Sequence, residues 1–170
     1  MATATAATTT IDTTKVADRR SLHFDRLEDI SADLDRLAAS GEVRALGNWS
    51  PGQLLKHLAT TLNKSIDGFE NPLPGFVRVI FRTFLKKRFL TGPMSAGFKL
   101  PKKALAELVP APVSFEDGLQ FLRQAIHRLQ TETQRAPNPV LGPLTVEEWN
   151  QLHCRHCELH LSFLVPGSRP

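Results

Sequence analysis

Three histidines near the C-terminus stand where an amphipathic helix would carry core leucines. At about 100° per residue, His153, His156 and His160 fall on one narrow stripe. Imidazoles buried without partners would cost about 1–3 kcal/mol for each unsatisfied polar group, whereas a divalent metal would satisfy them directly. His156 and His160, at i and i+4, have the spacing of paired zinc ligands on a helix. The stripe therefore predicts a metal-binding pair, either His156 with His160 or His153 with His156. Core histidines with ordinary hydrogen-bond partners are the alternative.

A metal held by two histidines of one helix needs a ligand from another part of the chain. His57 is the best candidate, because it falls at the margin of a leucine face, where a side chain can point into a cleft between helices. His127 lies off the apolar stripe of its helix and is expected at the surface. His23 precedes the first expected helix and could cap it or line a cleft. The spacing favours His57 as the third ligand without deciding it.

Five helices are expected to position these residues, and strand patterns are almost absent. The clearest helix begins where Ser50 and Gln53 form a capping box ahead of a run of leucines. The last helix should begin after Thr145 and run to about Leu164. Apolar spacing places the other three helices at about 27–37, 76–90 and 115–129. The fold class is therefore all-α, a bundle of four main helices with an additional short helix at 76–90.

The chain has 170 residues, which predicts one domain. Residues 1–18 are mainly alanine and threonine and are expected to form a disordered tail, with residues 19–170 as the helical domain. No stretch approaches the roughly 18 apolar residues of a membrane span, and the N-terminus lacks the apolar core of a secretory signal. We therefore expect a cytoplasmic protein. Cys154 and Cys157 lie in the middle of a helix, which favours apolar packing over redox chemistry.

Positive charge is concentrated in one part of the chain. Between Glu70 and Glu107 there are eight basic residues and no acidic one. Within the segment 76–90, phenylalanines alternate with Arg78 and Arg82 at helical spacing. Three interpretations stay open for this segment. It could be a solvated face over a bundle, a surface that binds an anionic membrane or nucleic acid, or a lid that attracts an anionic substrate to the metal cleft.

Two parts of the chain resemble the DinB/YfiT-like superfamily of metal-dependent enzymes. Segment 48–58, Asn-Trp-Ser-Pro-Gly-Gln-Leu-Leu-Lys-His-Leu, resembles the signature of its second helix. Segment 155–161, Arg-His-Cys-Glu-Leu-His-Leu, resembles the His-x-x-x-His motif of its last helix. Segments 98–101 and 159–164 are similar to an uncharacterised bacterial branch of the superfamily. The resemblance covers about residues 20–166.

The resemblance implies an up-down four-helix bundle whose metal is held by one histidine of the second helix and two of the last. At the matching positions these are His57, His156 and His160. Many members of the superfamily follow the last histidine with arginine, glycine and glutamine, whereas this chain continues with leucine, serine and phenylalanine. His153 is extra to the motif. It could hydrogen-bond a metal-bound water or substrate, or it could simply pack in the core.

Three protein ligands leave a coordination position open, as in catalytic sites, and neutral imidazoles suit zinc or nickel. Such an ion could lower the pKa of a bound water or hold a thiolate. Characterised members of the superfamily bring a low-molecular-weight thiol to an electrophile, so the resemblance implies a thiol-dependent transferase, with a metal-dependent hydrolase close behind. The expected substrate is a small molecule that could be anionic, and a homodimer is compatible with the sequence. The alternative from another class is a non-catalytic metal-binding or interaction protein.

Overall fold

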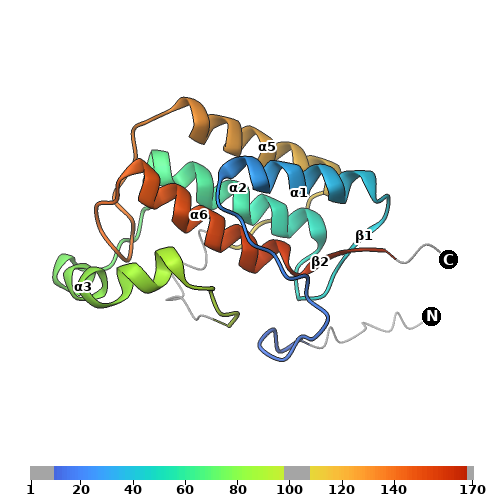
Figure 1. Ribbon diagram of the computed structural model, residues 1–170, viewed down its shortest axis with the longest axis horizontal. Helices are drawn as coiled ribbons and strands as arrows, with labels where there is room; N and C mark the ends of the chain where they lie inside the picture. Colours follow the sequence, from blue (N-terminus) through green and yellow to red (C-terminus); the bar gives the residue numbers. More distant parts are fainter. Residues whose placement is uncertain (1–9, 98–107, 168–170) are drawn as a thin grey trace, which may run out of the picture.

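The computed structural model describes residues 10–97 and 108–167, and this part of the chain is mostly helical (Figure 1). Its elements in chain order are α1 (Leu27–Ala39), β1 (Val43–Ala45), α2 (Pro51–Asp67), α3 (Gly75–Thr91), α5 (Phe115–Thr131), α6 (Val146–Leu161) and β2 (Leu164–Pro166). The described residues are mostly helical, as expected, and they also contain one small two-stranded sheet that was not expected. Segment 98–101, which contributed to the resemblance, lies outside the described residues, as do residues 1–9 of the expected tail.

The helix starts follow from side-chain capping. At the start of α2, Ser50 Oγ accepts a hydrogen bond from the Gln53 backbone N–H, and the Gln53 side chain accepts from the Ser50 N–H. Thr145 and Glu148 form the same reciprocal pair at the start of α6. Each box satisfies two backbone N–H groups that the first turn of a helix leaves unpaired. The two helices that carry the histidines therefore begin at positions fixed by local sequence.

Four helices, α1, α2, α5 and α6, lie side by side around the main core (Figure 1). The fifth helix, α3, lies outside this group and packs against α6. The directions of the four helices do not simply alternate, so the up-down order that the resemblance implied is wrong for α2 and α5. Gly52 of α2 lies against Ser114, just ahead of α5, and Asp67 at the other end of α2 pairs with Arg128 of α5. The two helices are therefore parallel, and the long connection between them, which contains α3, begins at one end of α2 and ends beside the other. Helical bundles accommodate such crossovers.

The close approach of α2 and α5 depends on two glycines. A Cβ atom on Gly52 would lie 2.3 Å from the carbonyl oxygen of Ser114, and one on Gly118 would lie 2.7 Å from the carbonyl oxygen of Gly52. Both contacts are to backbone atoms, which cannot rotate away. Glycine at these positions therefore sets the separation of α2 and α5, and with it the position of the helix that carries His57.

The C-terminus differs from the sequence prediction. The last helix ends at Leu161 rather than near Leu164, and residues 164–166 form β2, which pairs antiparallel with β1 (Ala45 opposite Leu164). A hydrogen bond from the Leu46 N–H to the Phe163 carbonyl oxygen continues this pairing by one position. Each strand has three residues, too few for alternation of apolar and polar side chains to be recognised.

The segment before α1 is tied to the end of α6. The Arg20 guanidinium donates to both carboxylate oxygens of the buried Asp33, at 2.8 and 2.7 Å, and to the carbonyl oxygen of Leu161. Further towards the N-terminus, the backbone of Ile11 exchanges two hydrogen bonds with the side chain of Asn48. Among the helices of the described residues, none is both long enough and apolar enough to span a membrane.

Candidate metal centre

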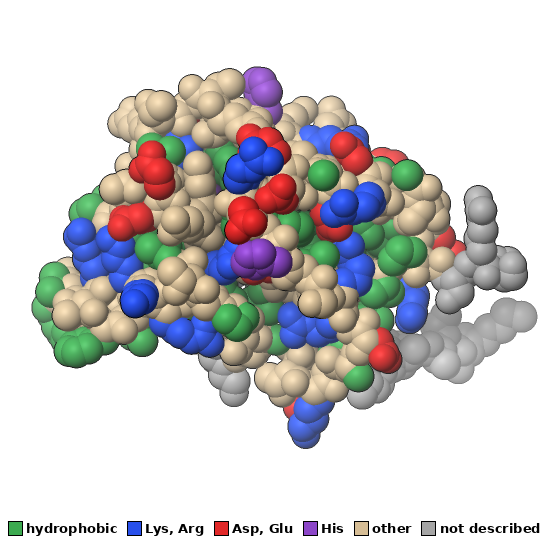
Figure 2. Space-filling model, in the orientation of Figure 1, with side chains coloured by type: hydrophobic (Ala, Val, Ile, Leu, Met, Phe, Trp, Pro, Cys, Tyr) green, Lys and Arg blue, Asp and Glu red, His purple; other side chains and the backbone are tan. Residues whose placement is uncertain are grey.

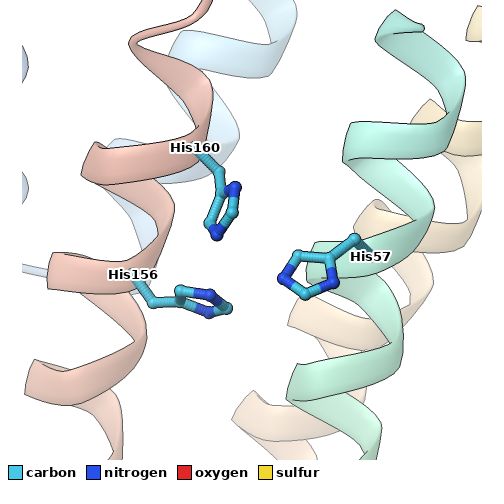
Figure 3. A group of neighbouring side chains, drawn as sticks. All are labelled: His57, His156 and His160. Atoms are coloured by element: carbon cyan, nitrogen blue, oxygen red, sulfur yellow. The ribbon is translucent and has the colours of Figure 1, made fainter. Parts of the chain in front are cut away.

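Three imidazole rings meet between α2 and α6 (Figure 3). The ring centroid of His57, on α2, lies 5.3 Å from that of His156 and 4.7 Å from that of His160. The two rings of α6 are 4.6 Å apart, as expected for side chains on successive turns. One nitrogen of each ring lies within 4.8 Å of the others. The structure therefore brings together the three residues that the resemblance implied as ligands.

The ring of His57 is oriented by the chain that follows the crossover. Its Nδ1 lies 2.9 Å from the carbonyl oxygen of Leu108. Because a carbonyl oxygen can only accept, Nδ1 carries the proton and donates it to this bond. The lone pair of His57 is then on Nε2. Fixing the tautomer through the second nitrogen is how metal-ligating histidines are usually held.

A hydroxyl group on α2, that of Thr61, orients the ring of His156. Thr61 Oγ1 donates its proton to the carbonyl oxygen of Leu58 at 2.8 Å, and the same oxygen lies 3.4 Å from His156 Nδ1. With its proton already used, the hydroxyl accepts from His156 Nδ1–H. This contact, although long, leaves Nε2 of His156 as the nitrogen with a free lone pair.

Burial keeps these rings neutral. It is the largest cause that lowers the pKa of His57, and it lowers the pKa values of His156 and His160 well below their usual value. The positive charge of a neighbouring ring opposes protonation further, since His160 and His57 both act on His156. A neutral imidazole is the form that binds a metal. Near neutral pH the cluster therefore presents three lone pairs rather than three charges.

The donor set fits a divalent ion of intermediate softness. Within residues 10–97 and 108–167, these three side chains are the group of histidine, cysteine or acidic residues that could hold a metal. Three neutral nitrogens without a carboxylate or thiolate suit zinc or nickel better than magnesium or calcium. Zinc–nitrogen bonds of about 2.0–2.1 Å would draw the rings somewhat closer together. Three ligands leave room for a further one from outside the protein.

The three histidines line an open cavity of about 750 Å³, a size typical of small-molecule sites. Its walls are mainly apolar and come from α2, the end of α3, the end of α6 and nearby loops, including Trp49, Leu54, Phe89, Met94, Val109, Leu159 and Phe163. Among the described lining residues, Arg88 is the one with a full charge at neutral pH, and it donates to the carbonyl oxygen of Pro93 at 2.8 Å. The described lining contains no aspartate or glutamate.

The structure places His153 outside the three-ring cluster. Its Nε2 lies 3.0 Å from Ser65 Oγ, which donates its own proton to the Leu62 carbonyl oxygen, so His153 donates to Ser65. Its ring stacks on Trp149 with centroids 5.1 Å apart. Complete burial lowers the pKa of His153 to about 3. The residue faces a second, smaller cavity of about 180 Å³, which His156 also lines.

The remaining residues singled out from the sequence lie away from the cluster. His127 is exposed, as expected, and His23 is exposed beside Asp25 and Glu158. Cys154 and Cys157 are buried in the main core. Burial raises the pKa of Cys154 to about 11 and that of Cys157 well above its usual value, so neither is a ready thiolate.

Three parts of the site were missed from the sequence. Thr61 lies one helical turn after His57 in a leucine-rich face, and that polar interruption was the signal that could have identified it. Trp49, whose ring centroid is 4.8 Å from that of His57 and 6.1 Å from that of His160, had no spacing relation to either residue. The Leu108 carbonyl group is backbone and carries no sequence signal.

Comparison with known proteins identifies a family. A family model described as a protein of unknown function (DUF1569) matches residues 16–167, and the chain belongs to this family. The match includes all three histidines of the cluster and both helices that carry them. Neither the search of curated proteins nor that of solved structures found a match.

Proposed function

We propose that this protein is a metal-dependent enzyme with a DinB-like four-helix bundle, in which His57, His156 and His160 hold one divalent ion, zinc or nickel. The observation that carries the proposal is the meeting of three neutral imidazoles from α2 and α6 at the wall of a cavity of about 750 Å³. A closed structural site would have a fourth protein ligand. Here the open side of the cluster faces the cavity, where a small molecule can reach it.

The chemistry we favour is activation of a thiol, followed by its transfer to an electrophile. When bound, the ion would supply a Lewis acid that stabilises the deprotonated form of a thiol or a water. The described lining has no carboxylate to act as a general base, and the chain has no tyrosine. A thiol, with a pKa near 8.5, needs a much smaller shift to lose its proton near neutral pH than water does. This difference favours a transferase over a hydrolase.

The protein's own groups would position the reactants. The Leu108 carbonyl and the Thr61 hydroxyl hold the rings of His57 and His156. The apolar walls exclude water and accept the apolar part of a substrate. Arg88, although exposed and bonded to Pro93, lies in the lining and could attract an anionic group on the thiol or the electrophile.

The test is conjugation of several low-molecular-weight thiols to a model electrophile by metal-loaded protein. We expect acceleration that is lost in His160→Ala and kept in His127→Ala, because His127 is an exposed histidine away from the site. Metal binding without acceleration for any thiol, together with ester hydrolysis by the loaded protein, would move the assignment to a hydrolase. Metal binding without either reaction would favour the non-catalytic alternative.

A further inference from the structure

Helix α3 carries an apolar face that nothing in the described structure covers. Phe76 and Phe84 are 72% and 77% exposed, and Val79 and Ile80 are 64% and 54% exposed. At about 100° per residue these four side chains fall within an arc of about 140° on the helix. Figure 2 shows hydrophobic side chains gathered at the end of the molecule that α3 forms. Contiguous exposed apolar surface of this kind is typical of an interaction site.

The C-terminal end of α3 attaches the helix to the domain. Leu90 is buried against Trp149 and Leu152 of α6, and Phe89 packs against the same cluster. Lys86 forms an ion pair with Glu148 in the first turn of α6. The contacts with α6 therefore come from the C-terminal part of α3, and they do not use Phe76 or Phe84.

The charges on α3 all have one sign. The helix carries Arg78, Arg82, Lys86, Lys87 and Arg88 and no acidic residue. Arg82, Lys87 and Arg88 are exposed. On the helix, Lys87 falls within the apolar arc and the other two lie beyond its edges. The exposed face of α3 is therefore mainly apolar, with Lys87 in its C-terminal half and with Arg82 and Arg88 flanking it.

We propose that α3 docks this protein on an anionic membrane surface. A helix that lies in the interface buries its apolar side chains at the acyl boundary while its lysines and arginines meet the anionic headgroups. Nucleic acid would take the positive charges but leave Phe76 and Phe84 in water. A second copy docked on the same face would bring two sets of five basic residues together. An anionic bilayer can bury the apolar side chains of α3 and pair its basic side chains with headgroups at the same time.

The docked helix also borders the candidate metal centre. Phe89, at the C-terminal end of α3, and Met94, just after it, line the 750 Å³ cavity. Docking through α3 would therefore bring a mainly apolar cavity close to an apolar phase. The docking itself does not depend on the metal or on the proposed reaction.

The test is co-sedimentation of the full chain with phosphatidylcholine vesicles, with and without phosphatidylserine. We expect binding to the anionic vesicles, weaker binding to the neutral ones, and loss of binding as salt is raised. The double substitution Phe76→Ser/Phe84→Ser should weaken binding to anionic vesicles by about tenfold or more, and Arg82→Ala/Lys87→Ala should weaken it and reduce its dependence on salt. Phe121→Ser is the matched control, because Phe121 is an exposed phenylalanine on α5.

Equal binding of the wild type and the Phe76→Ser/Phe84→Ser variant would overturn the proposal, as would equal affinity for neutral and anionic vesicles. A dimer in solution that this variant abolishes, without vesicle binding by the wild type, would assign the face to a second copy. Binding to duplex DNA in place of vesicles would assign it to nucleic acid. An unchanged far-UV circular dichroism spectrum and urea midpoint in each variant confirm that the domain is folded.

Discussion

Nδ1 of His57 donates a hydrogen bond to the carbonyl oxygen of Leu108, 2.9 Å away, and this leaves Nε2 of His57 as the nitrogen with a free lone pair. The bond joins α2 to the chain that returns from the crossover. It fixes the tautomer of the one histidine of the cluster that does not come from α6. The acceptor is a backbone carbonyl group, which no side-chain substitution can remove. The corresponding contact of His156 is with the Thr61 hydroxyl, and a substitution of Thr61 can test it directly.

Thr61→Val should weaken metal binding while keeping the fold. The substitution keeps the shape of the side chain but removes the oxygen 3.4 Å from His156 Nδ1. Loss of a group that orients a ligand typically costs 10–100-fold in affinity, and because this contact is long we expect about tenfold. Thr60→Val is the matched control, since Thr60 bonds to the Lys56 carbonyl and to no histidine. Competition with a chromophoric chelator measures both; equal affinity in the two variants would contradict a role for Thr61.

His153→Gln should make the metal-free protein less sensitive to acid. The folded-state pKa of His153 is about 3 and its usual value is 6.5, so between these values the unfolded chain binds a proton that the folded chain does not. Stability from this residue is therefore present above about pH 6.5 and is lost as the pH falls towards 3. Below pH 6.5, removing it should flatten the slope of unfolding free energy by about 1.4 kcal/mol per pH unit.

Urea unfolding at several pH values measures that slope. Burial, which lowers the pKa values of the other buried histidines most, is the same in both proteins, and the charge of His153 is the smallest of the causes acting on His156. The difference between the wild type and His153→Gln therefore reports mainly His153. His127→Gln, at an exposed position, should keep the wild-type slope. If His153→Gln kept it as well, His153 would have to be accessible to protons in the folded state.

Gly52→Ala should destabilise the protein by forcing α2 and α5 apart. The new Cβ would lie 2.3 Å from the Ser114 carbonyl oxygen, and inserting atoms into a closely packed site costs about 1–3 kcal/mol. Gly75→Ala has nothing within 4 Å of its Cβ and should be neutral or slightly stabilising. Urea denaturation compares them; similar midpoints would mean that the approach of α2 and α5 is not set by glycine.

Much of the helical framework could be predicted because its signals are local. Ser50 with Gln53, and Thr145 with Glu148, mark two helix starts through side chains that lie three residues from their partners. The short strands escaped prediction because their pairing, such as Ala45 opposite Leu164, joins segments far apart in the chain. The parallel course of α2 and α5 depends equally on distant contacts.

The candidate site shows the same division. Spacing placed His156 and His160 on one face, but only the register of α2 against α6 brings His57 to them. Periodicity also placed a helix over residues 76–90, yet it could not show that Phe76 and Phe84 face outward while Leu90 is buried. Leu90 lies on the same side of α3 as Phe76, so it is the part of the helix that reaches α6, and not its apolar pattern, that decides which side chains are buried.

The central claim is that His57, His156 and His160 together hold one metal ion, and metal analysis of purified protein tests it most directly. After loading with zinc or nickel and removal of excess metal, the wild type and His127→Ala should each retain about one ion per chain, whereas His57→Ala should retain little. Full retention of metal by His57→Ala, or a wild type that binds neither ion, would contradict the account.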